Sequence, residues 1–428
     1  MKKTMKRSTV CTSAVGEVRV EENALSVTGY TVTFFYRNQN ATNVQLVGGF
    51  DFVDENDKRA YSGGVFSTSE AADSYCIPPE KWSKGTSLWH VNDLSCIRDM
   101  QKVDEGWVFS LDLTSGYYLF YYKVSCDNGE SWQSIMNLEK LSDGNKQKSM
   151  PMPYQIYVPY NAKKQNPQDD LTWQTPAAEE NDQGKEIYLE YTGIGNTVMP
   201  LKVYLPAQYD PHRKEPYKVL YLSHGGLGGE WDWIRHGHAG NIIDNLIADN
   251  ICERFITVMM NNSIFQGSYM ENFGVNDWNY DAIYQNLTEI LIPYIEEHYN
   301  VSKKASDRAY AGLSMGAWTT CEIYYRNPEL FGYYGFFSGG APLTIPQVAD
   351  YSDYKKPSLY LAAGWADVAL GIFYHTPSDH SLLGFKEKLD ESGITYNNGG
   401  SYYSVQRGHD WYTWPQILKD YVSNYLWK

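Results

Sequence analysis

The nonapeptide Tyr310–Trp318 reads YAGLSMGAW and holds one serine, Ser314, with a glycine two residues to either side. It follows a predicted strand over Arg308–Ala311 and precedes a predicted helix over Trp318–Arg326. A serine at so sharp a strand-to-helix turn has strained dihedrals, and side chains two residues away would collide, so both positions favour glycine. The helix N-terminus also favours developing negative charge. We interpret Ser314 as a nucleophile; the alternative is a small-residue helix start.

The second half of the chain alternates between short apolar runs and helical patterns. In LTEILIPYIEEHY, the residues Leu287, Ile290, Leu291, Tyr294 and Ile295 share one face of a predicted helix. A last helix is predicted over Pro415–Tyr425. Besides the strand before Ser314, strands are predicted over Tyr217–Leu222, Phe255–Met260, Ser358–Ala362 and Tyr402–Val405. This alternation predicts the α/β fold class, with a mostly parallel sheet covered on both faces.

The first part of the chain carries β-strand signals instead. Short β-branched and aromatic runs are separated by turn residues, which predicts an all-β sandwich. The predicted strands are Tyr30–Tyr36, Asn43–Phe50, Trp107–Leu113 and Tyr117–Val124. Residues 161–185 read NAKKQNPQDDLTWQTPAAEENDQGK, a polar stretch without hydrophobic periodicity, and we expect a linker there. The predicted organisation is a tail over 1–28, a sandwich over 29–160, the linker, and a catalytic domain over 186–428.

Composition narrows the class of partner. The 428 residues carry a formal net charge of -15, which argues against nucleic acid or an anionic membrane as the main partner and favours a neutral substrate. No apolar run is long enough to predict a transmembrane helix. The 37 Tyr and 13 Trp residues suit half-wet surfaces such as sugar-binding faces, although ordinary core filling explains many of them.

The cysteines and the N-terminus do not decide the cellular compartment of the protein. None of the six cysteines lies in a C-x-x-C pair or a zinc-ligand spacing, so free buried thiols are the default expectation. The N-terminal MKKTMKRSTVCTSAVGEVRVEE has basic residues followed by a short polar stretch, a poor signal-peptide core. The sequence therefore leaves open whether the protein stays inside the cell or has had a signal peptide removed.

A serine hydroxyl needs a base to take its proton, and in this kind of fold the acid and then the histidine follow the serine along the chain. Only His375, His380 and His409 lie beyond Ser314. His409 comes just after the predicted strand Tyr402–Val405, at the edge where open α/β sheets build their sites, and is our candidate base.

The candidate orienting acid is Asp367, just past the strand that ends near Ala363, in a glycine-containing turn. Its other interpretation is a turn or N-cap aspartate. Three rivals are less suitable. Asp353 precedes that strand, Asp379 lies well beyond it, and the side chain of Asp410 diverges from its neighbour in sequence, the base.

Two backbone N–H groups complete the predicted site as an oxyanion hole. One belongs to Met315, the residue after the nucleophile, and the other to Gly226 in the run His224–Gly229 (HGGLGG). Glycines there let the backbone approach a substrate closely. The chain has no P-loop or dinucleotide-binding glycine pattern, so phosphate binding is a weak interpretation of this loop.

Five stretches, in this order, resemble a known family: YLSHGGLGGEWDW, LTEILIPYIEEHY, YAGLSMGAW, LAAGWAD and RGHDWYTW. Together they are similar to the esterase D-like α/β-hydrolases, and most of all to carbohydrate esterase family 1, the feruloyl and acetyl xylan esterases. The resemblance covers roughly Gly184–Lys428. It implies a triad of Ser314, Asp367 and His409 and an oxyanion hole at Gly226 and Met315, the residues reached above.

The first domain resembles the immunoglobulin-like E-set sandwich of carbohydrate-binding module family 48, through VTFFYRNQNATNVQLVGGF and GWVFSLDLTSGYYLFYYKV. Members of the esterase family from degraders of plant fibre carry such a module. The resemblance implies secretion and binding of glycan, or a module that packs on the esterase and shapes its cleft. The poor signal peptide keeps a cytoplasmic location open, and the oligomeric state is not indicated.

The expected function is hydrolysis of esters on plant cell-wall polysaccharide through an acyl-enzyme, without a metal or organic cofactor. Aromatic abundance favours a feruloyl esterase acting on feruloylated xylan or xylo-oligosaccharides, with acetylated xylan as the alternative. Further alternatives are a catecholate siderophore esterase and a non-catalytic glycan-binding protein. Tryptophans near the motif loops are candidate stacking surfaces for substrate: Trp231, Trp278, Trp365 and Trp411, with Trp233 beside them.

Overall fold

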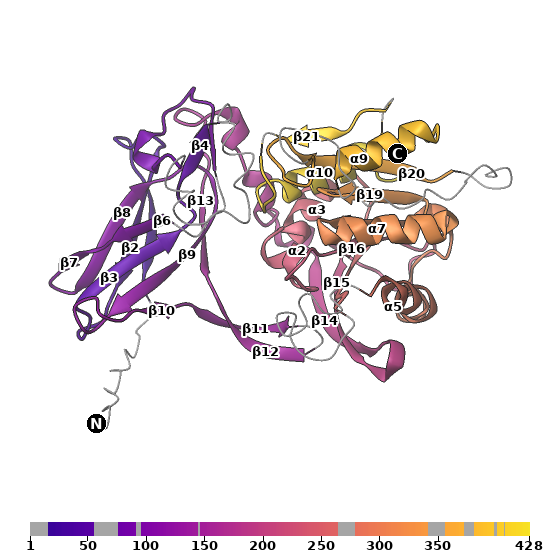
Figure 1. The fold of residues 1–428 in the computed structure, drawn as a ribbon, viewed down its shortest axis with the longest axis horizontal. Helices are drawn as coiled ribbons and strands as arrows, with labels where there is room; N and C mark the ends of the chain where they lie inside the picture. The colour runs from indigo at the N-terminus through magenta and orange to yellow at the C-terminus, as the bar shows by residue number, and fades with distance from the viewer. Residues whose placement is uncertain are drawn as a thin grey trace, which may run out of the picture. The chain divides into compact units, whose positions relative to one another are not determined.

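The computed structural model describes residues 16–54, 76–90, 96–143, 146–263, 279–340, 356–371, 381–397, 400–405 and 407–428. The chain divides into two compact units. The first is made mainly of residues before Thr172, and the second holds Trp173–Lys428 (Figure 1). No described helix is long and apolar enough to cross a membrane.

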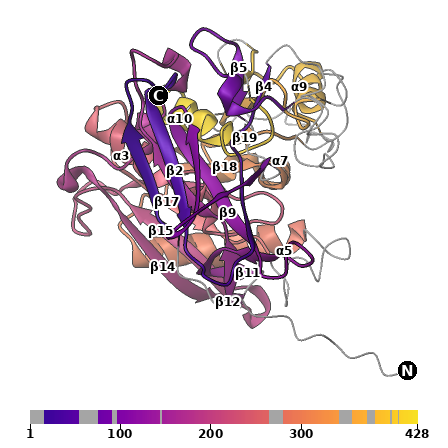
Figure 2. The ribbon, with the colours of Figure 1, turned by 90° about the vertical axis from the view of Figure 1, so that its left-hand side faces the viewer.

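The first unit is an antiparallel β-sandwich, seen from another side in Figure 2. One sheet has the order β1-β2-β8-β7, and the other has the order β10-β9-β3-β6 with β13 also paired to β9. The bounds are β1 Val18–Glu22, β2 Tyr30–Tyr36, β3 Asn43–Gly48, β6 Cys96–Asp99, β7 Gln101–Val103, β8 Gly106–Asp112, β9 Gly116–Ser125, β10 Gln133–Ile135 and β13 Tyr154–Val158. A smaller pair is β4 Phe52–Asp54 with β5 Leu88–His90, and η2 is Pro79–Lys81. The pair of β11 Asn137–Asp143 with β12 Lys146–Met152 is divided between the units, because Lys140–Ser149 is grouped with the second.

The core of the sandwich follows from alternation along the strands. Every second residue of β2 is buried from Val32 onward, because a strand turns successive side chains to opposite faces. The two sheets meet through aromatic pairs: the ring centroids of Phe34 and Phe120 lie 5.0 Å apart, and those of Tyr36 and Tyr122 also lie 5.0 Å apart. Many of the abundant tyrosines therefore fill cores rather than cover a sugar-binding face.

The polar stretch over residues 161–185 is anchored rather than free. Gln165 is fully buried in the first unit, where its side chain donates to Thr28 O and accepts from Ser115 N–H. Farther along, Asn245 of the second unit donates to the carbonyl oxygens of Trp173 and Thr175. The short turns η3 Pro167–Asp169, η4 Thr172–Gln174 and η5 Glu180–Asp182 fall in this stretch. The Asn245 amide thus satisfies two carbonyl groups of this irregular backbone, and the Gln165 amide fastens the stretch to the first unit.

Within the described residues, the second unit is built on an eight-stranded sheet of order β14-β15-β17-β16-β18-β19-β20-β21. The pairs β14–β15 and β15–β17 are antiparallel, and the remaining pairs are parallel. The bounds are β14 Lys185–Thr192, β15 Val198–Leu205, β16 Lys218–Ser223, β17 Phe255–Met260, β18 Arg308–Leu313, β19 Tyr333–Phe337, β20 Ser358–Gly364 and β21 Tyr403–Val405. This mostly parallel sheet with helices is α/β-hydrolase-like, as the sequence predicts.

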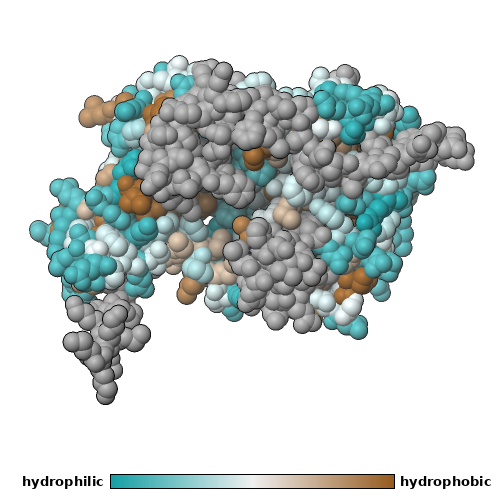
Figure 3. All heavy atoms as spheres, viewed as in Figure 1, coloured by the Kyte–Doolittle hydropathy of each residue, from teal (hydrophilic) through white to brown (hydrophobic). Residues whose placement is uncertain are grey.

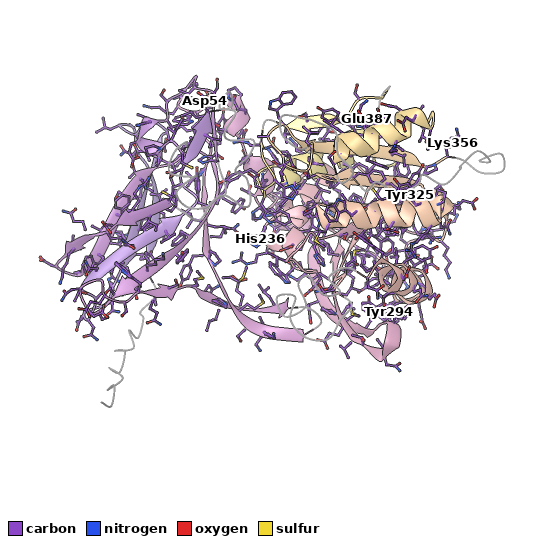
Figure 4. All side chains as sticks on the ribbon, viewed as in Figure 1. Asp54, His236, Tyr294, Tyr325, Lys356 and Glu387 are labelled. Atoms are coloured by element: carbon purple, nitrogen blue, oxygen red, sulfur yellow. The ribbon has the colours of Figure 1, made fainter. Side chains whose placement is uncertain are left out.

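Helices cover both faces of this sheet (Figure 1). One apolar core contains side chains from η7, α6, α7 and α9, and the other contains side chains from α3 and α10. The bounds are α2 Asp232–Arg235, α3 Ala239–Ala248, α5 Tyr280–Gln285, η7 Asn286–Leu291, α6 Ile292–His298, α7 Met315–Arg326, α9 Leu382–Glu391 and α10 Trp414–Asn424, with the short turns η6 Ile194–Asn196, η8 Ala305–Asp307 and η9 Pro328–Leu330. Tyr325 on α7 and Glu387 on α9 are labelled in Figure 4.

Three local outcomes differ from the expectations. Strands β14, β15 and β19 were not predicted. The helix over LTEILIPYIEEHY contains a π-turn, so Ile292 is buried while Ile290 and Tyr294 are only partly buried. Pro293 has no N–H to donate, which suits the wider turn. Cys126 is disulfide-bonded, so the expectation of free thiols is wrong for that residue.

Candidate active site

Ser314 occupies the turn between β18 and α7. Its dihedrals are φ 53° and ψ -120°, a left-handed conformation that costs energy in any residue with a side chain. The Ser314 N–H donates to Phe337 O at 2.9 Å, which ties the turn to the end of the neighbouring strand β19. The strain projects the serine side chain from the turn instead of folding it into α7.

The two motif glycines are required by close approach. A Cβ on Gly312 would lie 2.4 Å from Gly316 O, and a Cβ on Gly316 would lie 2.4 Å from His224 O. Both distances are well below van der Waals contact, so neither position accepts a side chain without a backbone shift. The spacing G-x-S-x-G therefore reflects how tightly this turn packs on itself and on the loop after β16.

Three side chains far apart in sequence meet at this turn. His409 Nε2 lies 3.0 Å from Ser314 Oγ, and His409 Nδ1 lies 2.7 Å from Asp367 Oδ1. With Nδ1–H donating to the carboxylate, Nε2 is left to accept the serine proton. Asp367 Oδ1 also accepts the Ala369 N–H at 2.7 Å, which fixes the carboxylate in its turn.

Burial and mutual attraction act against each other in the Asp367–His409 pair. Burial by itself would raise the pKa of Asp367, but the charge and hydrogen bond of His409, with the Ser338 hydroxyl and the Ala369 N–H, bring it below its ordinary value. Burial would lower the pKa of His409, but the Asp367 carboxylate raises it above its ordinary value. The imidazole is thus a stronger base than a solvated one.

The loop after β16 runs directly beside the serine. A Cβ on Gly225 would lie 3.2 Å from Ser314 Cβ and 2.6 Å from Leu313 Cδ1. Gly226 is exposed, and Leu227 has φ 63° and is 59% exposed, so the loop turns outward immediately past Gly225. The glycine run therefore brings backbone next to the reacting hydroxyl, as an oxyanion hole requires.

His224 holds this loop in place from inside. Its Nε2 accepts the Asn262 N–H at 3.0 Å, so its Nδ1–H donates to Gly225 O at 2.7 Å. Burial lowers the pKa of His224 to about 4, which keeps the ring neutral in this arrangement. The residue links the carboxyl ends of β16 and β17, and its role was not predicted from the sequence.

The two predicted oxyanion donors lie on the loop after β16 and at the start of α7. Gly226 is exposed in the turn that follows the buried Gly225, and Met315 is the first residue of α7, directly after Ser314. A helix N-terminus carries partial positive charge, so an oxyanion beside Met315 would be stabilised by α7 as well as by hydrogen bonding.

The candidate tryptophans have different environments. Trp231 is 5% exposed, and its ring meets His236 edge-on at 5.7 Å. Trp411 is partly buried, with His236, labelled in Figure 4, tilted against it at 5.6 Å. Trp365 is 40% exposed, two residues before the acid. Trp278 lies outside the described residues.

Exposed apolar side chains accompany the site loops. Besides Leu227 and Trp365, Val368 is 44% exposed directly after Asp367. The coloured residues of the face in Figure 3 are mostly hydrophilic, and the hydrophobic ones among them lie in small separate groups. Apolar side chains left in water beside a reactive group suit contact with an apolar part of a substrate.

Of the rival residues, Asp410 is the one that the structure describes. Its Oδ1 accepts the N–H groups of Tyr412 and Thr413, so it organises the loop before α10. His375, His380, Asp353 and Asp379 lie outside the described residues. Among the residues that the structure describes, no group of three or more His, Cys, Asp or Glu side chains could hold a metal ion.

Comparison with known proteins gives the family. The family described as "Putative esterase" matches residues 193–424, more than half of the chain. An endo-1,4-beta-xylanase/feruloyl esterase from Xylanibacter ruminicola is 38% identical over 166 residues, which cover 37% of this chain and 22% of that protein. Endo-1,4-beta-xylanase Y from Acetivibrio thermocellus is 28% identical over 167 residues, covering 36% of this chain and 14% of that protein.

The sequence identity to solved structures is lower. A ferulic acid esterase from Anaeromyces mucronatus is 21% identical with a TM-score of 0.48, covering 59% of this chain and 94% of its own. The enterobactin esterase from Shigella flexneri is 13% identical with a TM-score of 0.49, covering 95% of each chain. The chain spans less than a quarter of the curated relatives it matches. By the match over residues 193–424, the chain belongs to this family of esterases.

Proposed function

We propose that this esterase acts through Ser314, Asp367 and His409 on feruloyl esters of xylan, releasing hydroxycinnamates through an acyl-enzyme. The observation that carries the proposal is the continuous hydrogen-bonded arrangement from Asp367 Oδ1 through His409 to Ser314 Oγ. A neutral imidazole poised on a serine hydroxyl beside a glycine-rich loop is the arrangement used for acyl transfer.

The chemistry proceeds in two halves. As Ser314 Oγ attacks the ester carbonyl, its proton passes to His409 Nε2, and the Asp367 carboxylate stabilises the imidazolium. The N–H groups of Gly226 and Met315 hold the oxyanion. The ester C–O bond breaks, and the sugar alcohol leaves with the proton from His409, which gives the acyl-enzyme. Water then attacks the acyl carbon and loses a proton to His409; the bond to Ser314 Oγ breaks, the serine takes that proton back, and the acid is released.

Two observations favour an aromatic acyl group on a neutral glycan. The site loops expose Trp365, Leu227 and Val368, which suit a planar apolar group. The formal net charge of -15 disfavours an anionic substrate. The name of the Xylanibacter ruminicola relative pairs xylanase with feruloyl esterase, and we extend that substrate class to this chain.

The first unit is proposed as a glycan-binding module of the family 48 kind, on the resemblance of its strands. Ser314→Ala protein should be retained on insoluble xylan at a fixed salt concentration. A chain whose sandwich does not bind glycan should wash through. Because the variant cannot turn over the ester, retention measures binding apart from catalysis. Passage of intact Ser314→Ala protein through the xylan would argue against a glycan-binding role.

A substrate panel tests the esterase proposal. Methyl ferulate, acetylated xylan and a catecholate lactone are offered to wild type, to Ser314→Ala and to Ser306→Ala, whose serine is exposed on η8 away from the site. We expect fastest hydrolysis of methyl ferulate, a loss of roughly 10⁴–10⁶-fold in Ser314→Ala and an unchanged rate in Ser306→Ala. Faster release of acetate would reassign the substrate to acetylated xylan, and equal rates in wild type and Ser314→Ala would defeat the mechanism.

A further inference from the structure

Four neighbouring strands deliver residues to one edge of the sheet. Ser314 follows β18, Ser338 follows β19, Asp367 follows β20 and His409 follows β21. Three of these residues form the proposed triad. The fourth, Ser338, directly follows β19, the strand between those that precede the serine and the acid, and no catalytic role has been given to it above.

The backbone of Ser338 is unusually constrained. It has φ 54°, is fully buried, and donates its N–H to Ala362 O of β20 at 2.7 Å. A serine rarely adopts a left-handed conformation, and Ser338 is buried rather than in an exposed turn. The residues packed around it therefore determine its conformation. The residue is thereby fastened to the strand that carries Asp367.

The hydroxyl of Ser338 accepts one hydrogen bond and keeps its own proton free. Trp414 Nε1–H donates to Ser338 Oγ at 3.0 Å, which occupies a lone pair and leaves the single hydroxyl proton to point elsewhere. Asp367 Oδ1 is already engaged by His409 and the Ala369 N–H. Asp367 Oδ2 is buried and has no hydrogen-bond partner among the described residues, and the Ser338 hydroxyl is among the neighbours that lower the pKa of Asp367. The free proton of the Ser338 hydroxyl and the open acceptor of Asp367 can therefore pair.

The same tryptophan also contacts the base. The ring of Trp414 meets the His409 imidazole edge-on, with centroids 5.1 Å apart and planes at 86°. Trp414 is 7% exposed and begins α10, so a rigid helix holds it. One indole therefore braces the imidazole with its ring and orients the serine next to the acid with its N–H.

We propose that Ser338, oriented by Trp414, is a positioning residue for the reaction, donating a hydrogen bond to the Asp367 carboxylate when His409 becomes an imidazolium. The inference rests on the proposed function and extends it to a serine outside the triad. A buried ion pair is stable only when its remaining acceptors are satisfied, and this hydroxyl supplies a donor as the pair forms. It also makes the carboxylate a weaker base, so the proton stays on His409.

Two substitutions separate the hydroxyl from the backbone. Ser338→Gly removes the hydroxyl and suits the left-handed conformation, whereas Ser338→Ala removes the hydroxyl and keeps the strain. In both variants we expect kcat to fall about 10- to 100-fold, the effect of one hydrogen bond to a charged group, with KM nearly unchanged. In both, the acidic limb of kcat/KM should move to lower pH, because the imidazolium form of the Asp367–His409 pair loses the hydrogen bond that stabilises it.

Trp414→Phe tests the second step. It deletes the indole N–H and keeps an aromatic ring against His409, so we expect a smaller shift in the same direction. When Trp414→Phe is added to Ser338→Gly, the acidic limb of kcat/KM should move no further, because the hydrogen bond from the indole N–H acts only through Ser338. Trp82→Phe, at a buried tryptophan of the sandwich, is the matched control and should leave the limb in place.

A readout without turnover keeps this inference apart from the proposed function. The pKa of His409, followed by NMR titration of its ring, should fall in Ser338→Gly and Ser338→Ala whether or not any tested ester is hydrolysed. An unchanged pKa of His409 in both variants would overturn the inference, even with full esterase activity in the wild type. Activity that tracks thermal stability alone, recovering in the glycine variant, would reduce Ser338 to a structural role and overturn it too.

Discussion

Gly316 faces His224 so closely that a Cβ on the glycine would lie 2.4 Å from the His224 carbonyl oxygen and 2.9 Å from Ser223 Oγ. The first turn of α7 is thus packed against the loop that is proposed to supply the oxyanion donor. The position of the nucleophile relative to the proposed oxyanion hole therefore depends on Gly316 having no side chain.

Gly316→Ala should therefore damage activity and stability together. Overpacking of this kind costs about 1–3 kcal/mol of unfolding free energy, and displacement of the loop should lower kcat more than tenfold. Urea unfolding and ester hydrolysis measure the two effects. Gly393→Ala is the control: Gly393 has φ 66° and open space around it, so only stability should fall, by about 1–2 kcal/mol. Normal kcat in Gly316→Ala would show that the loop does not depend on this contact.

Residues of the triad should behave as a unit. Ser314→Ala and His409→Ala should each remove most of the rate, by roughly 10⁴–10⁶-fold, and the double variant should be no slower than either. Asp367→Asn should cost about 10⁴-fold, because an amide beside Nδ1 favours the wrong tautomer. Steady-state rates on one ester give all four values. If the fold loss in the double variant equals the product of the two single losses, Ser314 and His409 act independently.

The dependence of the rate on pH should report His409. Its pKa is raised above the ordinary value by Asp367, and the base must be neutral to accept a proton. We therefore expect kcat/KM to fall tenfold per pH unit below a midpoint that lies above about 6.5. A pH profile with a non-ionising ester measures it. A midpoint well below that value would mean that another group limits the rate.

Stability should depend on pH through Asp232, which is buried beside the glycine-rich loop. Burial raises the pKa of Asp232 to about 8, whereas an unfolded aspartate titrates near 3.9. Between those values unfolding releases a proton, so this group's contribution to wild-type stability declines as pH rises and is constant above about 8.

Asp232→Asn mimics the protonated acid and lacks this dependence. Relative to wild type, it should gain about 1.4 kcal/mol per pH unit between roughly pH 4 and 8. Urea unfolding at pH 5 and at pH 8 gives the difference. The exposed Asp249→Asn is the control and should run parallel to wild type. Parallel curves for Asp232→Asn and wild type would mean that Asp232 is ionised in the folded protein.

Trp365 should act in binding rather than in chemistry. It is 40% exposed, so Trp365→Ala should leave unfolding free energy within about 0.5 kcal/mol of wild type. If the ring stacks on an aromatic acyl group, KM for methyl ferulate should rise about 3- to 10-fold while KM for an acetyl ester stays the same. Equal changes for both esters would remove Trp365 from acyl recognition.

Elements with a strong local pattern were predictable. The strands β2 and β17 have the predicted bounds, Tyr30–Tyr36 and Phe255–Met260, because β-branched and aromatic residues dominate both. Strand β19 was missed: its sequence YYGFF is short and contains Gly335, where a Cβ would lie 2.8 Å from Ala311 Cβ. That glycine reflects close approach of β18, which a local pattern does not report.

The omission of β19 explains why Ser338 was missed. Residues at the carboxyl ends of parallel strands are site candidates only after the strands themselves are recognised. His224 was noted only as part of a glycine run, and Trp414 only as the last letter of RGHDWYTW. Their roles depend on hydrogen bonds to Asn262 N and Ser338 Oγ, which are distant in sequence.

Local sequence by itself determined the strand-to-helix turn at Ser314, the alternation of strands and helices, and the candidates Asp367 and His409 after their strands. These features depend on periodicity, on glycine and on chain order, which short windows contain. Only the tertiary structure decided that β18, β19, β20 and β21 lie in that order side by side. That order brings a hydroxyl, an imidazole and a carboxylate within hydrogen-bonding distance, because such contacts act over a few ångströms in space regardless of separation along the chain.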